Sequence, residues 1–151
     1  MMNISSDQTD HVIQAAQSSA GQLGVAACIA VLDAAGHLKC FTRMDRAWLG
    51  AIDVAIKKAR TSILFEADTE QIWEVCKPNA PAHGLEFTND GLVTFAGGIP
   101  LRDARGELCG AIGVSGGQVG EDREIAKAGQ QAWLQRLTSS SHELIYGETS
   151  C

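Results

Sequence analysis

The residues best suited to chemistry start with a cation and an acid at the end of an extended segment, Arg43-Met44-Asp45. An arginine at the rim of a sheet can grip a carboxylate through two parallel hydrogen bonds. Lys58, in the helical segment that follows, can join such a site, and Asp45 can transfer a proton. The simpler alternative is a surface ion pair in which Asp45 caps the next helix. The pattern therefore predicts either an anion-binding site or an ordinary helix start.

His83 is a second candidate. It stands in a segment, Lys77–Gly84, that two prolines keep out of regular structure. Its imidazole can exchange a proton near neutral pH, so a pocket-facing His83 would serve as a ligand or as an acid or base. A lone loop histidine is more often a solvated side chain. Both interpretations stay open for this residue.

Two glycine-rich stretches, Gly97-Gly98 and Gly113–Gly117, indicate close approach of the backbone to another group. The second stretch matches the G-x-S-x-G nucleophile elbow. That motif belongs to a parallel sheet in a longer chain, and only His142 follows it, so a serine hydrolase is disfavoured. Glu121 and Asp122 in the next helix would repel phosphate, which disfavours a phosphate loop. A strand that ends tightly against a helix or a ligand is the remaining interpretation.

The elements that position these residues follow from hydrophobic periodicity and turn chemistry. Helices are predicted from the Ser5-x-x-Gln8 capping box to about Gly21, then over Trp48–Ile63, Ala67–Cys76 and Glu121–Leu137. Strands are predicted over Val25–Leu32, His37–Met44, Leu92–Ala96, Ile99–Arg102 and Leu108–Ser115. In the second helix, Asp53 and Lys57 are spaced to form a surface ion pair.

The order of these elements, α-β-β-α-α-β-β-β-α, predicts an α+β fold with a five-stranded antiparallel sheet flanked by helices. Val25–Leu32 is apolar without alternation, which is typical of an interior strand covered on both faces. Two matching turns, Asp33–Gly36 and Asp103–Gly106, predict hairpins. A single domain is expected over residues 1–137, and the polar run Thr138–Ser141 is expected to end the last helix and begin a polar tail, residues 138–151.

Composition limits the classes of function. The chain of 151 residues carries 12 basic and 18 acidic side chains, and this net negative charge disfavours nucleic-acid binding. No segment is apolar enough to span a membrane, and no secretory signal is recognisable at the start. The five cysteines are therefore expected to be free thiols in the cytoplasm, and no metal-ligand spacing occurs. Helices rich in small apolar residues predict a homo-oligomer.

Four segments together resemble the GlcG/HbpS-like haem-binding family, which includes PduO C-terminal-like domains, over roughly residues 8–135. They are Arg43–Asp45, Asp53–Thr61, Gly97–Leu101 and Gly110–Gly117 with Glu121-Asp122. The resemblance implies a profilin- or PAS-like α+β fold that forms oligomers, with members that bind haem and some that have been linked to its degradation. Haem would require an apolar slot and cations for its propionates, which Arg43 and Lys58 could supply, with His83 as the candidate iron ligand.

Three functions follow from these observations. The first is binding of haem or another tetrapyrrole. The second is a cofactor-independent lyase, isomerase or hydratase acting on a small organic acid, with an arginine clamp and a His83 or Asp45 proton-transfer group. The third is a non-catalytic accessory or assembly protein. The residues expected to border one pocket are Arg43, Asp45, Lys58, His83, Gly97, Gly98, Ser115, Gly116 and Gly117.

Overall fold

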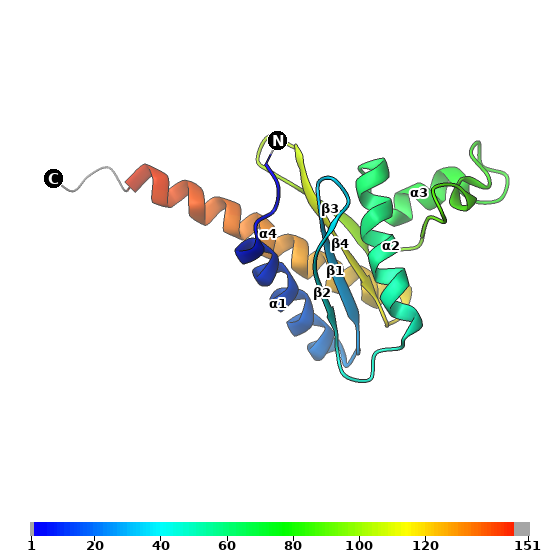
Figure 1. The fold of residues 1–151 in the computed structure, drawn as a ribbon, viewed down its shortest axis with the longest axis horizontal. Helices are drawn as coiled ribbons and strands as arrows, with labels where there is room; N and C mark the ends of the chain where they lie inside the picture. The colour runs from blue at the N-terminus through cyan, green and yellow to red at the C-terminus, as the bar shows by residue number, and fades with distance from the viewer. Residues whose placement is uncertain (1, 147–151) are drawn as a thin grey trace.

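The computed structural model describes residues 2–146, with side chains described through residue 139. The elements follow one another as α1 (Ser6–Leu23), β1 (Cys28–Asp33), β2 (Leu38–Arg43), α2 (Gly50–Phe65), α3 (Thr69–Cys76), the 3-10 turn η1 (Leu85–Phe87), β3 (Gly98–Arg102), β4 (Leu108–Ser115) and α4 (Val119–Tyr146). Figure 1 shows α1 and α4 on one face of the sheet and α2 on the other, with α3 beyond α2.

The sheet has four strands in the order β2-β1-β4-β3, and every neighbouring pair is antiparallel. The prediction of five strands is therefore wrong, and the described strand and helix order differs accordingly. The prediction of an interior antiparallel strand is confirmed, although it begins at Cys28 rather than Val25. Both predicted hairpins are also present, because β1 pairs with β2 and β3 pairs with β4.

The missing strand is the segment Leu92–Ala96, which is irregular. Its alternation is real, since Leu92, Thr94 and Ala96 are buried while Phe95 is exposed. Its backbone, however, is bonded to helices rather than to a strand: Val93 N–H donates to Thr61 Oγ1 (3.1 Å), and Phe95 C=O accepts from Thr69 Oγ1 (2.7 Å). A period of two shows which side chains are buried, but only backbone pairing makes a strand.

Two hydrophobic clusters hold the layers together. Ile29, Val31, Ile112 and Val114 of β1 and β4 face α1 and α4, whereas alternate residues such as Ala30 face α2. The α2 helix lies directly on β4, because a Cβ at Gly113 would fall 2.0 Å from the Ala55 carbonyl oxygen. This close contact brings side chains on the inner face of α2, such as Lys58, within reach of β4.

The last helix is longer than predicted. The expected polar break at Thr138–Ser141 lies inside α4, which continues to Tyr146 and extends beyond the rest of the fold (Figure 1). The hydroxyls of Thr138 and Ser139 donate to the Gln135 carbonyl oxygen at 2.8 and 3.0 Å, so these side chains bond back into the helix instead of ending it. Residues 147–151, the last part of the expected tail, lie outside the described residues.

Candidate functional site

Lys58 is the centre of a buried charged cluster. Its side chain is 0% exposed, and its Nζ donates to the Val114 carbonyl oxygen (2.7 Å) and to Asp122 Oδ2 (2.9 Å). Asp122 lies in the first turn of α4, and its other oxygen accepts from Gly117 N–H at 2.9 Å. The cluster thus joins α2, the end of β4 and the start of α4.

An aromatic ring covers the ammonium group. Lys58 Nζ lies 4.7 Å from the centroid of the Phe95 ring, within the range of a cation–π interaction. Burial lowers the pKa of Lys58 below its ordinary value, and the attraction of the Asp122 carboxylate opposes this shift. Burial also raises the pKa of Asp122, against the attraction of Lys58. Burial thus disfavours the charged form of both side chains, and the attraction between them favours it.

The two glycines at the start of β3, Gly97 just before the strand and Gly98 as its first residue, make room for this cluster. A Cβ at Gly97, whose φ is +121°, would lie 2.6 Å from the Val114 carbonyl oxygen and 2.8 Å from Lys58 Nζ. A Cβ at Gly98 would lie 2.5 Å from the Lys58 carbonyl oxygen. The close approach predicted at these glycines therefore exists, and the group that approaches is α2 with its lysine.

A large apolar cavity, about 570 Å³ in volume, lies beside the cluster, between α3, the irregular segment and the start of α4. Its lining consists of Glu70, Gln71, Trp73, Glu74, Thr94, Phe95, Ala96, Val119 and Arg123. Phe95 belongs to both places, because its ring covers Lys58 Nζ and also lines the cavity. Arg123 Nε donates to both oxygens of Glu70 at 2.9 Å, so this charged pair is matched within the wall.

None of the residues that line the cavity was predicted from the sequence to belong to a site. Trp73 and Phe95 are two of only eight aromatic residues in the chain, and they are 41% and 47% exposed. Exposed aromatic side chains in an aromatic-poor protein are a usable signal of a binding surface. Exposure depends on which elements pack on which faces, so the signal becomes visible only in the folded chain.

Arg43 is the last residue of β2, and Asp45 lies two residues beyond it. Both side chains are exposed. Arg43 is in register with Cys28, which is in register with Ser115 on its other side, so these three residues form one row across the sheet. Burial raises the pKa of the Cys28 thiol, and the charge of Arg43 opposes the shift. Among the described residues the Arg43 guanidinium has no ion pair or hydrogen bond.

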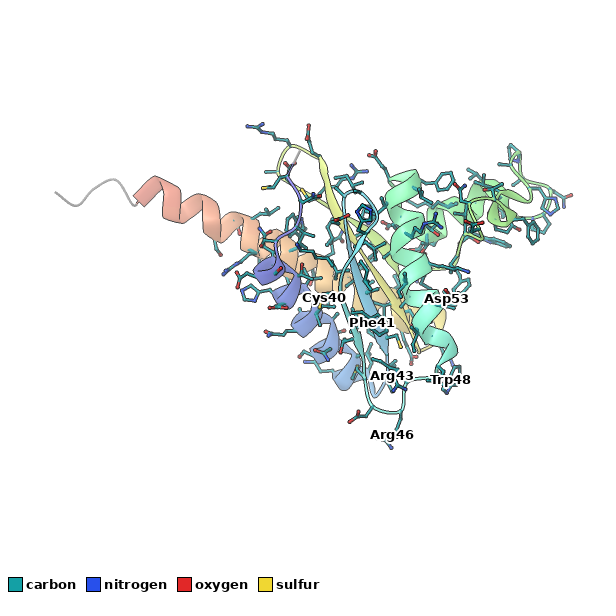
Figure 2. All side chains as sticks on the ribbon, viewed as in Figure 1. Cys40, Phe41, Arg43, Arg46, Trp48 and Asp53 are labelled. Carbon is teal, nitrogen blue, oxygen red and sulfur yellow. The ribbon has the colours of Figure 1, made fainter. Side chains whose placement is uncertain are left out.

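A second, smaller hollow of about 330 Å³ lies near this end of the sheet. Gly116 and Gly117 line it together with Arg46 and Trp48 of the β2–α2 connection. Figure 2 shows Arg43, Arg46 and Trp48 around this connection. The side chain of Trp48 is 76% exposed, which makes it the most open aromatic group at this end.

His83 does not join either group. It is exposed in the loop that follows α3, and it lines neither the large cavity nor the hollow. Figure 1 shows this loop well away from the end of β2 that carries Arg43. The structure thus divides the predicted pocket residues among three places. Lys58 lies with Gly97 and Gly98, the Arg43 end of the sheet carries Asp45, Ser115 and Gly116, and His83 lies in its own loop. Gly117 belongs to the first two places, because it donates to Asp122 and also lines the hollow.

Metal-binding clusters and membrane-spanning helices are both absent from the described part of the chain. No group of three or more His, Cys, Asp or Glu side chains that could hold a metal ion occurs among the described residues. In the same part of the chain, no helix is both long and apolar enough to cross a membrane.

The chain is similar to several known proteins. It is 35% identical over 115 residues to an uncharacterised 15.0 kDa protein of Citrobacter freundii from the dhaT–dhaS intergenic region, covering 76% of this chain and 80% of that protein. It is 39% identical over 116 residues to the corrinoid adenosyltransferase PduO of Salmonella typhimurium, covering 76% of this chain but only 34% of that enzyme.

A solved structure and a family model extend these similarities. A crystal structure of a PduOC–haem complex matches 87% of this chain and 95% of that chain, with 33% identity and a TM-score of 0.83. The model of the family described as haem-degrading protein HbpS-like matches residues 4–131. These residues include all the described strands and most of the helices, so the chain belongs to the HbpS-like family.

Proposed function

We propose that this protein binds haem or a related tetrapyrrole in the cavity between α3, residues 94–96 and the start of α4. The observation that carries the proposal is the apolar cavity of about 570 Å³ with Trp73 and Phe95 in its wall. Aromatic and aliphatic walls of this kind suit a flat, largely apolar ligand. The similarity to a protein solved as a haem complex supports the same class of ligand.

The cavity residues fit the macrocycle and its carboxylates. Val119 and Ala96 extend the apolar surface, and Arg123 supplies a guanidinium that can pair with a propionate in place of Glu70. None of the lining residues is the histidine, cysteine, methionine or tyrosine that usually ligates haem iron, and His83 does not reach this cavity. The chain would therefore hold haem mainly through apolar contacts and Arg123, and bound haem would supply an iron centre for redox or oxygen chemistry.

Titration of the purified chain with haemin, followed by the Soret band, tests this proposal. We expect stoichiometric binding with a high-spin spectrum, because the lining offers oxygen donors rather than nitrogen or sulfur. Trp73→Ala should weaken binding by about tenfold, or about 1.4 kcal/mol, through loss of apolar contact. Phe87→Ala is the matched control, since Phe87 is an 83% exposed aromatic residue outside the cavity. No saturable binding, or equal losses in both variants, would contradict the proposal.

The Arg43 end of the sheet supports a second candidate function. The free guanidinium of Arg43 can bind the carboxylate of a small organic acid, and the exposed Asp45 nearby in sequence can transfer a proton. This arrangement corresponds to a cofactor-independent lyase, isomerase or hydratase. It takes a different ligand at a different place from the haem cavity, so the two functions can be tested separately.

We also propose that the chain acts as a homo-oligomer in the cytoplasm. Trp48 and Leu49 are adjacent in sequence and are 76% and 71% exposed, which supports a contact with another copy of the chain. Light scattering should return a multiple of the 16.0 kDa chain mass, and a monomer mass at micromolar concentration would contradict assembly.

The compartment is supported by the cysteines. Cys28, Cys40, Cys76 and Cys109 are free thiols, which is typical of proteins in a reducing compartment. Cell fractionation tests this part of the proposal.

A further inference from the structure

Lys58 is fully buried, which is rare for a lysine side chain. A fully buried ammonium group loses its hydration, and a buried ion pair is weak evidence for stability because the desolvation penalty can exceed the attraction. Lys58 Nζ has two oxygen partners, the Val114 carbonyl and the Asp122 carboxylate, and an aromatic ring over it. A buried, charge-paired lysine beside a ligand-sized cavity is a candidate reactive group.

Among the described residues of this cluster, only Phe95 also lines the cavity. Its ring is half-exposed, and Lys58 itself does not line the cavity. The Phe95 backbone is held in place, because its carbonyl accepts from Thr69 Oγ1 at 2.7 Å. Its side chain can therefore rotate between staggered positions while the backbone stays fixed, a motion that partly exposed side chains make rapidly. Such a rotation would open Nζ to the cavity.

The neighbouring groups suit amine chemistry. The Asp122 carboxylate lies 2.9 Å from Nζ and can take its proton, and burial favours the neutral forms of both side chains. A neutral amine is a nucleophile toward carbonyl carbon, and lysines in apolar surroundings are the ones used for imine formation. The cavity wall offers apolar contact for the rest of a carbonyl compound.

We propose that Lys58 forms an imine with a small apolar aldehyde or ketone that enters the cavity when the Phe95 ring swings aside. The amine nitrogen attacks the carbonyl carbon, a C–N bond forms, and the carbonyl oxygen receives a proton to give a carbinolamine. Loss of water then forms the C=N bond, with Asp122 carrying protons between nitrogen and oxygen. The sum is one aldehyde and one amine giving one imine and one water, and no oxidant or reductant takes part.

This proposal does not rest on haem binding, although both ligands would occupy the same cavity. Haem binding is measured by absorbance and leaves no covalent mark, whereas imine formation is measured by a covalent adduct. A chain that binds haemin but forms no adduct contradicts only the imine, and the reverse result contradicts only the haem proposal.

The test is incubation of the full chain with benzaldehyde and sodium cyanoborohydride, which reduces an imine to a stable benzylamine. Mass spectrometry of peptides then assigns the adduct among the five lysines, Lys39, Lys57, Lys58, Lys77 and Lys127. We expect Lys58 to be labelled at least about tenfold faster than any exposed lysine, because its amine is desolvated and beside a base. Lys57→Met should leave this labelling unchanged, since Lys57 pairs with Asp53 on the outer face of α2.

Two variants test the route to the amine. Phe95→Ala should speed labelling of Lys58 several-fold, and Phe87→Ala should not change it. Lys58→Met should abolish the adduct, and if that variant fails to fold, peptide assignment in the parent and in Phe95→Ala still decides. Labelling spread evenly over the exposed lysines would overturn the proposal, and labelling of Lys58 that Phe95→Ala leaves unchanged would overturn the entry route.

Discussion

Lys58 and Arg43 are two cations near the same sheet, and their surroundings differ in every respect that matters for charge. Lys58 is fully buried, pairs with Asp122 and lies under an aromatic ring. Arg43 is exposed at the end of an edge strand, and its guanidinium has no partner among the described residues. The Lys58 charge is solvated by protein groups, so removing its partner costs folding free energy. The Arg43 charge is solvated by water and is free to bind an anion.

The largest expected effect is the loss of stability when the buried Lys58–Asp122 pair is broken. Asp122→Ala leaves the Lys58 ammonium without its carboxylate, and breaking a buried pair in this way costs about 3–5 kcal/mol of the free energy of unfolding. Asp53→Ala breaks the exposed Asp53–Lys57 pair, whose atoms lie 3.1 Å apart, and should cost no more than about 1 kcal/mol. Urea denaturation of both variants measures the difference. Equal losses would show that burial does not distinguish the two pairs.

The next effect concerns ligand binding at the exposed cation. Arg43→Ala should weaken binding of a small carboxylate by about 1.5–3 kcal/mol, the range for a hydrogen bond to a charged group. The same change should alter the free energy of unfolding by no more than about 0.5 kcal/mol, because an exposed side chain without partners is removed. Calorimetric titration with a panel of small carboxylates, alongside denaturation, checks both parts. A large loss of stability with unchanged binding would assign Arg43 a structural role instead.

A smaller effect tests the packing around Lys58. Gly98→Ala places a Cβ 2.5 Å from the Lys58 carbonyl oxygen, so α2 must shift, and we expect a loss of about 1–3 kcal/mol in the free energy of unfolding. Gly21→Ala is the control, because that glycine lies inside α1 with nothing within 4 Å of the added Cβ. The control should gain up to about 1 kcal/mol from helix propensity. Thermal denaturation shows whether Gly98→Ala lowers stability while Gly21→Ala raises it. An unchanged stability of Gly98→Ala would mean that the contact with α2 relaxes easily.

We expect the pKa of Lys58 in the folded chain to lie below its ordinary value. Because burial lowers the pKa of Lys58 in the folded chain below its ordinary 10.5, the unfolded chain holds this proton more tightly. The contribution of this group to the free energy of unfolding should therefore rise with pH between its folded-state pKa and 10.5. Carbon NMR of labelled lysine side chains measures the folded-state value. Titration of Lys58 at or above 10.5 would rule out the shift.

The local features of the fold were predictable from sequence because each depends on residues close together in the chain. Asp33 Oδ1 accepts from Ala35 and His37 N–H, and Asp103 Oδ1 accepts from Arg105 and Glu107 N–H, so the repeated turn sequence gives the same turn twice. The Ser5–Gln8 capping box and the Asp53–Lys57 pair also form as their spacing predicts. The strand predicted at Leu92–Ala96 is absent, because a strand needs backbone hydrogen bonds to another strand that is distant in the chain.

The hairpins, the interior strand, the presence of the helices and, through the resemblance, the family were all predictable from the amino-acid sequence. The burial of Lys58 against Asp122, the contact of Phe95 with both this pair and the cavity, and the separate positions of Arg43 and His83 came to light in the folded chain. Periodicity and turn chemistry act over a few residues, whereas desolvation of a charge depends on every element that packs around it. Lys58 and Asp122 are 64 residues apart in the chain, and α2 packed on β4 and the first turn of α4 bring them within a hydrogen bond of each other.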